Sequence, residues 1–334
     1  PDQEAIGFRD ERHTYSDIAR ESDQISKSLL ALGVEPGDRI GYFLGESVET
    51  VLIMLGAAKI GAICAPINSR FKPRELRQVI VHAGMKVVFT TASDAGTDFN
   101  ELIQRTFPQI AKSESSSLSL EDAPELQTVV VMDDIERPGT VNLTELDRLA
   151  QSVSDEEILF RQSGVRVRET AIIMYTSGTT AMPKGAMLSH EAFSRYGISL
   201  QERMLLNEDD KIWSALPMFH IGGVAFMLAS IFVGGTYFHT GHFDPGVALA
   251  QIRDERCTVA LPAFETIWLP IISHQDRTDN DLASLRTLMC VGVPERLREF
   301  QKATPDAPLL NLSLIHISEP TRPERIAADG GVVK

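Results

Sequence analysis

The sequence predicts an α/β fold in which two mostly parallel sheets are flanked by helices. Short apolar segments rich in β-branched residues alternate with amphipathic segments along most of the chain, up to residue 312. The 334 residues, 43% hydrophobic and 23% charged, are enough for one large or two ordinary domains with a substantial core. Such alternation implies right-handed crossovers, so we expect mostly parallel strands covered by helices.

The first part of the chain opens with a well-marked helix. Thr14, with Asp17 three residues later, forms a capping-box pattern, and the apolar face that follows ends at Gly33. Further helices are expected from Ser47 to Gly61, from Pro73 to Gly84 and over 143–149. Strands are expected at 39–44, 62–67, 86–90 and 128–132. The serine and acid content of segment 112–125 offers nothing to bury, so we expect a surface loop there.

The alternation resumes after residue 170. Strands are expected at 171–175, 211–216, 235–238, 258–261, 286–291 and 308–312. Helices are expected from Ser189, after Gly223, and over 245–255, 264–273 and 294–303. A polar, loop-rich stretch at 133–165 predicts a boundary between a first α/β subdomain over 1–165 and a second over 166–312.

The charge balance argues against nucleic acid as a partner. Lysine and arginine total 32 against 46 aspartates and glutamates, which gives a net charge of −14 that repels a phosphate backbone. Three scattered cysteines, Cys64, Cys257 and Cys290, fit neither a disulfide framework nor a zinc site and indicate a reducing, cytoplasmic setting. Residues 1–11 are charged and lack the apolar stretch of a signal peptide, so none is expected.

The uncharged run over 221–238 raises the question of a membrane. Its length approaches the ~20 residues of a spanning helix, but glycines near both ends leave only about a dozen good helix formers. The run therefore favours a buried helix over a spanning one. We expect no transmembrane segment, which leaves peripheral membrane contact open.

The segment 175–185, Tyr-Thr-Ser-Gly-Thr-Thr-Ala-Met-Pro-Lys-Gly, follows an apolar strand and precedes a helix. Glycine and small hydroxyl residues let backbone N–H groups and hydroxyls converge on an anion, and Lys184 adds a positive charge. The segment does not fit the P-loop pattern of nucleotide triphosphatases, because Pro183 rather than glycine precedes the lysine. It predicts a phosphate cradle, with an ordinary polar loop as the alternative.

At these residues the chain resembles the adenylate-forming (AMP-binding) superfamily, which includes acyl-CoA synthetases, luciferases and the adenylation domains of peptide synthetases. The family signature is Tyr-Thr-Ser-Gly-Thr-Thr-Gly-x-Pro-Lys-Gly. Three further segments resemble family motifs in the right order along the chain: 33–39 (Gly-Val-Glu-Pro-Gly-Asp-Arg), 61–70 and 217–223 (Pro-Met-Phe-His-Ile-Gly-Gly). The resemblance covers residues 10–312 and points to the acyl-CoA synthetase, or fatty-acid–CoA ligase, type.

The resemblance implies a two-step acid–thiol ligase reaction that uses ATP, Mg²⁺ and coenzyme A. A carboxylate, expected to belong to an apolar acid, attacks the α-phosphorus of ATP to give an acyl-adenylate and pyrophosphate, and the thiol of coenzyme A then displaces AMP. Two residues take catalytic roles: Lys184 stabilises charge on the leaving pyrophosphate, and His220 walls the acid from water. The cofactor-binding residues are Thr176, Ser177, Gly178, Thr179, Thr180, Lys184 and Gly292, with Thr180 also assigned to the metal.

The chain departs from the family pattern at three places. Ala181 stands where the family has glycine, and Val-Gly-Val-Pro at 291–294 stands where it has Gly-Gly-Ala-Pro. After Leu312 nothing aligns: the Mg²⁺-holding glutamate, the ribose-binding aspartate and the small C-terminal domain have no counterpart, and 313–334 reads as a disordered or artefactual tail. We therefore expect little activity from this chain, since much of what stabilises the transition state is missing.

Two alternatives remain open at this point. The chain could be a non-catalytic remnant that only binds ATP or an apolar acid. It could also be an amino-acid adenylation domain, but such a pocket needs an acidic residue near the helix after Met218, and 221–238 contains none.

Overall fold

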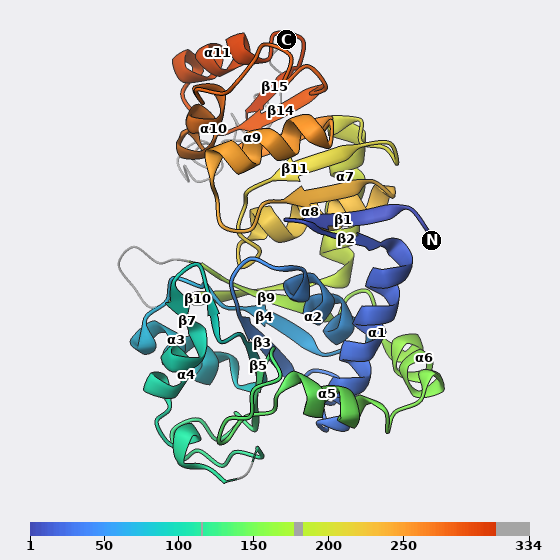
Figure 1. The fold of residues 1–334 in the computed structure, drawn as a ribbon. Helices are drawn as coiled ribbons and strands as arrows, with labels where there is room; N and C mark the ends of the chain where they lie inside the picture. The colour runs from blue at the N-terminus through green and yellow to red at the C-terminus, as the bar shows by residue number, and fades with distance from the viewer. Residues whose placement is uncertain (115, 177–182, 312–334) are drawn as a thin grey trace, which may run out of the picture. The chain divides into compact units, whose positions relative to one another are not determined.

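The computed structural model describes residues 1–114, 116–176 and 183–311 (Figure 1). By their contacts these residues form two compact units. Unit 1 comprises Pro1–Asp210 and Leu216–His242, and unit 2 comprises Lys211–Ala215 and the chain from Phe243 onward. The boundary expected at residue 165 does not coincide with this division, because the strand that begins at Thr170 pairs back into the sheet of unit 1.

A six-stranded sheet forms the centre of unit 1. Its strand order is β10 (Lys184–Ser189), β9 (Thr170–Thr176), β4 (Ile63–Pro66), β3 (Arg39–Phe43), β5 (Met85–Thr90) and β8 (Thr128–Val131). The pairs from β9 to β8 are parallel, whereas β10 runs antiparallel to β9. The sheet is therefore mixed, and its one antiparallel strand lies at an edge.

Unit 1 holds three more strands that join distant parts of the chain. Strand β1 (Glu4–Phe8) pairs in parallel with β12 (Thr236–His239) and antiparallel with β2 (Glu11–Thr14). A short hairpin is formed by β6 (Ser93–Asp94) and β7 (Thr97–Asp98). The Gln3 amide donates to the carbonyl oxygens of Glu208 at 2.9 Å and Gly234 at 2.7 Å, which fixes the chain just before β1.

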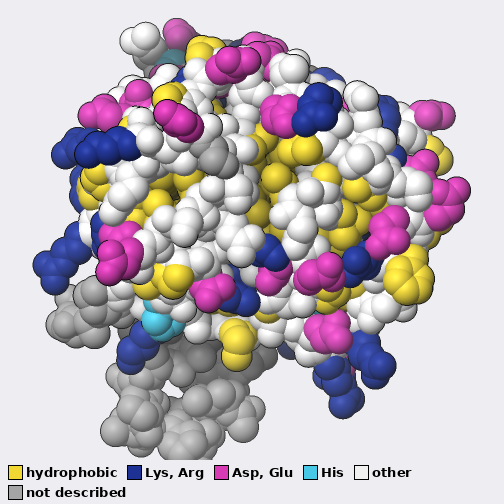
Figure 2. All heavy atoms as spheres, turned by 90° about the horizontal axis from the view of Figure 1, so that it is seen from below, with side chains coloured by type: hydrophobic (Ala, Val, Ile, Leu, Met, Phe, Trp, Pro, Cys, Tyr) yellow, Lys and Arg dark blue, Asp and Glu magenta, His cyan; other side chains and the backbone are white. Residues whose placement is uncertain are grey.

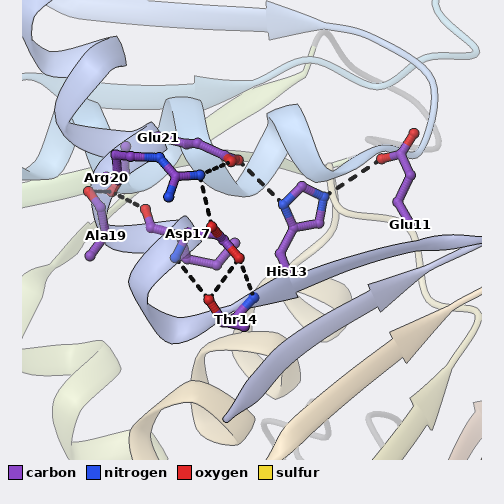
Figure 3. A network of polar contacts seen from close by, with 9 residues as sticks. Glu11, His13, Thr14, Asp17, Ala19, Arg20 and Glu21 are labelled. Atoms are coloured by element: carbon purple, nitrogen blue, oxygen red, sulfur yellow. Dashed lines mark hydrogen bonds and ion pairs between the residues drawn. The ribbon is translucent and has the colours of Figure 1, made fainter. Parts of the chain in front are cut away.

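The first helix of unit 1 begins where its capping residues predict. Helix α1 (Tyr15–Ala31) starts with a complete capping box: Asp17 N donates to Thr14 Oγ1 at 3.1 Å, and Thr14 N donates to the Asp17 carboxylate at 3.0 Å (Figure 3). His13 lies between Glu11 and Glu21 in the same network. The other helices are α2 (Val48–Lys59), α3 (Pro73–Ala83), α4 (Phe99–Thr106), α5 (Leu143–Ala150), α6 (Asp155–Gly164), α7 (His190–Met204), α8 (Ile221–Val233) and the 3₁₀ turn η1 (Ile110–Lys112).

Helices cover both faces of the six-stranded sheet. Figure 1 shows α1, α2 and α5 on one face and α3 and α4 on the other, and α1 packs against both α2 and α5. The core under α3 and α4 also takes in Leu118, Leu120 and Ala123, all at most 6% exposed. The expectation that 112–125 has nothing to bury was therefore wrong, because the apolar residues between its serines and acids are enough to anchor it to the core.

Unit 2 is a parallel sheet with its own helices. Its strands follow the order β15 (Leu309–Asn311), β14 (Thr287–Cys290), β13 (Val259–Ala263) and β11 (Lys211–Ser214), and each neighbouring pair is parallel. Its helices are α9 (Pro245–Asp254), α10 (Glu265–Ile272) and α11 (Pro294–Ala303). Trp213 and Trp268 are fully buried in the core of this unit.

The α/β fold with mostly parallel strands expected from the sequence is confirmed, and among the described strands of the larger sheets β10 and β2 run antiparallel to a neighbour. The strand expected at 171–175 does not lead directly to the helix at Ser189, because β10 intervenes and folds back along β9. Helix α8 begins at Ile221, two residues before Gly223. Strand β1 and helix α6 were missed.

Candidate functional site

The strand pair β9–β10 frames the segment expected to hold phosphate. Thr176 and Lys184 face each other across the antiparallel ladder, and Thr176 Oγ1 donates to the Lys184 carbonyl oxygen at 3.4 Å. The two ends of the segment are thus joined at its base. The remaining residues expected to contact phosphate or metal lie outside the described residues: Ser177, Gly178, Thr179, Thr180 and, at the glycine position, Ala181.

The Lys184 side chain is exposed. Within residues 1–114, 116–176 and 183–311, no carboxylate pairs with its ammonium group. A lysine without an internal counter-ion keeps its full charge for an external anion, which is what a phosphate contact requires. The described part of the site is consistent with an anion-binding role for Lys184.

Tyr175, at the end of β9, is held by the helix beside it. Its hydroxyl lies 2.9 Å from His82 Nδ1 on α3, and the two rings meet edge to face at 5.9 Å. Burial raises the pKa of the Tyr175 hydroxyl to about 12, so it stays protonated. This contact braces the end of β9, where the expected phosphate segment begins, and no sequence pattern indicated that His82 would be the partner of Tyr175.

His220 is the N-cap of α8. The N–H of Gly222 donates to its Nδ1 at 3.1 Å, and its own N–H donates to the Pro217 carbonyl oxygen at 3.0 Å. Because Nδ1 accepts, the neutral ring carries its proton on Nε2. Burial lowers the pKa of the imidazole, although the residue as a whole keeps substantial exposure. The ring therefore offers one N–H donor, from Nε2, at neutral pH.

The segment before His220 is fixed by side chains from elsewhere in unit 1. The Tyr42 hydroxyl donates to the Met218 carbonyl oxygen at 2.6 Å, and the Met218 N–H donates to the Glu46 carboxylate at 2.9 Å. Both polar groups of the Met218 backbone are thus satisfied, and Met218 itself is 3% exposed. Neither Tyr42 nor Glu46 was identified from the sequence.

A third side chain, His239 on β12, holds the same segment. The N–H of Gly241 donates to His239 Nδ1 at 2.9 Å, so the neutral ring donates from Nε2 to the Leu216 carbonyl oxygen at 3.3 Å. Complete burial lowers the pKa of His239 to about 4, and its ring stacks on Phe8 with centroids 5.7 Å apart. His239 is therefore a neutral structural residue at pH 7.

Glu46 borders a pocket of about 210 Å³ in unit 1. The pocket is lined also by Arg9, whose guanidinium pairs with Asp94 at 3.0 Å, and by Phe8. Burial, with the nearby Asp94 carboxylate adding to it, raises the pKa of Glu46 to about 7. The Met218 N–H and the more distant Arg70 act in the opposite direction but do not outweigh burial.

The apolar run of α8 serves mainly as core. Val224, Phe226 and Met227 are at most 3% exposed, and Phe226 meets the ring of Tyr196 edge to face at 6.2 Å. The buried helix that the sequence favours for this run is confirmed at these side chains. Phe232, at the other end of the helix, is 49% exposed.

Gly292 lies in unit 2, between β14 and α11. A Cβ at this position would approach Leu297 Cδ2 to 3.3 Å, so the glycine allows close packing of the turn against the helix. The neighbouring Val293 is 60% exposed. The turn leaves its outer side open, which an adenine contact would need.

The surface charges of the described residues are mixed in sign. On the face seen in Figure 2, the described Lys and Arg side chains lie among Asp and Glu side chains rather than in one continuous basic surface. Within the described residues, no cluster of three or more His, Cys, Asp or Glu side chains could hold a metal ion. Nor does any described helix combine the length and apolar character needed to cross a membrane.

Comparison with known proteins identifies the family. A family model for the AMP-binding enzyme matches residues 1–312. The chain belongs to this family. It is 30% identical over 287 residues to the acyl-CoA ligase SID4 of Ajellomyces capsulatus, covering 85% of this chain and 47% of that protein. It is 27% identical over 306 residues to the mitochondrial medium-chain acyl-CoA ligase ACSF2 of Bos taurus, covering 88% and 49%.

A solved structure supports the fold of this AMP-binding enzyme. The crystal structure of ATP-bound MatB from Rhodopseudomonas palustris matches with a TM-score of 0.72 at 22% identity, covering 90% of this chain and 55% of that one. The chain spans about half the length of the curated relatives it matches. The family and the fold expected from the sequence are both confirmed.

Proposed function

We propose that the protein activates a carboxylic acid with ATP and transfers the acyl group to coenzyme A. The observation that carries the proposal is the family match over residues 1–312, together with relatives named acyl-CoA ligases. The chain contributes the phosphate segment at 175–185 and the His220 segment, both in unit 1. The complete reaction is proposed for the protein of which this chain is a part.

Lys184 and the hydroxyl residues beside it would hold the triphosphate. The exposed ammonium of Lys184, with no described carboxylate to neutralise it, supplies positive charge where pyrophosphate departs. Thr176 marks the base of the segment, and Thr180, outside the described residues, is the proposed contact for Mg²⁺. The ion would neutralise charge on the phosphates when bound.

His220 would border the reacting end of the acid. Its Nε2–H can donate one hydrogen bond to a carboxylate oxygen, and its lowered pKa keeps the ring neutral at pH 7. A neutral donor orients a carboxylate without forming the strong ion pair that would reduce its nucleophilicity. We propose an apolar acid as substrate, because α8 contains no carboxylate to pair with an amino group.

The proposal is tested by ATP binding to this chain, measured by calorimetry in the presence of Mg²⁺. Lys184→Ala should weaken binding about 10- to 100-fold, the loss expected for one charge-assisted contact. Lys112→Ala, which removes an exposed lysine from η1, is the matched control and should bind ATP as the unchanged chain does. Equal affinities for all three proteins, or no ATP binding at all, would contradict the proposed role of the segment.

Exchange of labelled pyrophosphate into ATP tests the chemical step. It should depend on an added carboxylic acid, and a series of straight-chain and aromatic acids would identify the preferred class. Binding of ATP without exchange by any acid would favour the alternative, a chain that binds nucleotide and does not catalyse adenylation by itself.

A further inference from the structure

Three side chains hold the backbone that leads into His220. Tyr42 bonds the Met218 carbonyl oxygen, Glu46 bonds the Met218 N–H, and His239 bonds the Leu216 carbonyl oxygen. We call these three residues, which all lie in unit 1, the Met218 clamp. They come from β3, from the loop that follows it and from β12, so the clamp gathers distant parts of the chain on one short segment.

The clamped segment has little freedom to move. Tyr42 and Met218 are at most 3% exposed, and hydrogen bonds in such surroundings are costly to break because water cannot replace them. Just beyond the segment, a Cβ on Gly223 would lie 2.3 Å from the Pro217 carbonyl oxygen, so the first turn of α8 is pressed against it. Met218 is only two residues from His220, whose N–H bonds back to Pro217.

We propose that Glu46, with Tyr42, is a positioning residue that sets where the His220 imidazole stands. The inference deepens the proposed function and rests on it for the importance of His220, while the coupling itself concerns only residues of this chain. Glu46 touches no reacting atom in this scheme. It acts through the Met218 backbone and the two residues that follow.

The charges around Glu46 do not explain its placement. Asp94 and Glu49 also line its pocket and carry like charge, and Arg9 is already paired with Asp94. Arg70 attracts the carboxylate but makes no ion pair with it. Among residues 1–114, 116–176 and 183–311, the one hydrogen-bond donor that Glu46 meets is the Met218 N–H, which points to a role in holding that backbone.

The test is the titration of the His220 ring, followed by NMR on the full chain. Eight histidines contribute signals, and His220→Asn assigns the one of interest by its disappearance. Glu46→Ala should raise the titration midpoint of His220 toward its ordinary value, because a loosened segment admits water to the ring. Glu46→Gln keeps an oxygen acceptor for Met218 and should leave the midpoint unchanged. Glu49→Ala removes a carboxylate from the same pocket and serves as the control.

A second variant covers the case in which Glu46→Ala does not fold. Tyr42→Phe removes only the hydroxyl that bonds Met218 and should also raise the midpoint. The proposal is overturned if the titration midpoint of His220 is unchanged in Glu46→Ala. If Glu46→Ala does not fold, an unchanged midpoint in Tyr42→Phe overturns it instead. A rise of the same size in Glu46→Gln or in the control Glu49→Ala would also overturn it. Because no ATP or acid is present, a failure of ATP binding would refute the proposed function and leave this result intact.

Discussion

Two titratable groups of the Met218 clamp, the partly buried Glu46 and the fully buried His239, should give opposite contributions to the pH dependence of stability. The folded-state pKa of Glu46 is raised from 4.5 to about 7, so its contribution is fully present below pH 4.5 and is lost as the pH rises through 7. The folded-state pKa of His239 is lowered from 6.5 to about 4, so its contribution is present above pH 6.5 and is lost as the pH falls through 4.

Both contributions have a similar size. One pH unit between the folded and unfolded values corresponds to about 1.4 kcal/mol, so each group contributes about 3 kcal/mol over its range. As the pH falls from 7.5 to 4, Glu46 therefore raises the free energy of unfolding by nearly as much as His239 lowers it. These two groups together should leave the free energy of unfolding of the unchanged chain almost flat in this range.

Single substitutions separate the two effects. Urea unfolding of Glu46→Gln and His239→Gln is compared with the unchanged chain at pH 7.5, 6, 5 and 4, and differences between proteins remove the background from other titrating groups. As the pH falls from 7.5 to 4, the free energy of unfolding of Glu46→Gln should fall by about 3 kcal/mol relative to that of the unchanged chain, and that of His239→Gln should rise by about 3 kcal/mol. Differences that stay constant with pH, whatever their absolute values, would refute the assignment of these shifts to burial.

Three further substitutions and one matched control test the local packing of unit 1 by denaturant unfolding at pH 7. Thr14→Ala removes the N-cap of α1 and should cost about 1 kcal/mol, whereas an unchanged midpoint would show that water replaces the cap. Gly223→Ala should lower the free energy of unfolding by about 1–3 kcal/mol, because the new Cβ would lie 2.3 Å from a carbonyl oxygen. In the control Gly222→Ala the nearest neighbour of the new Cβ is at 3.4 Å, so this variant should be as stable as the unchanged chain or more stable. Equal losses in the two variants would contradict this explanation. Lys59→Met removes three hydrogen bonds to α1, the shortest at 2.7 Å, and should lower the free energy of unfolding by about 1–2 kcal/mol. An unchanged free energy of unfolding would show that hydrogen bonds to water replace them without loss.

The sequence predicted best those elements whose signals are local. The capping box at Thr14 and the proline at the first position of α3 mark helix starts by chemistry within one turn, and the structure confirms both. Helix α6 was missed although Ser154 caps it, because it buries only Ile158 and shows almost no apolar stripe. Strand β10 was missed because its exposed residues carry little strand preference; pairing with β9 creates it.

The residues of the candidate site show the same difference between local and long-range signals. His220 and Lys184 stand in contiguous motifs, so their order along the chain was enough to single them out. Glu46 acts on Met218, 172 residues away, and a single sequence contains no sign of that pairing. A carboxylate two residues beyond the apolar segment 40–44 was the available signal, since an acid so close to a buried strand usually has a specific partner.

The pairing of β1 with β12 bears on how the protein is made. Some 230 residues separate Ile6 from its partner Tyr237, so at about 5–20 residues per second the ribosome needs on the order of 10–50 s to deliver the second strand. Strands β3, β4, β5 and β8 are all available by residue 131 and can assemble during this delay. Strand β1 can pair with β2 at once, but its other edge must wait uncovered until β12 is made, which makes the nascent chain a natural client for a chaperone.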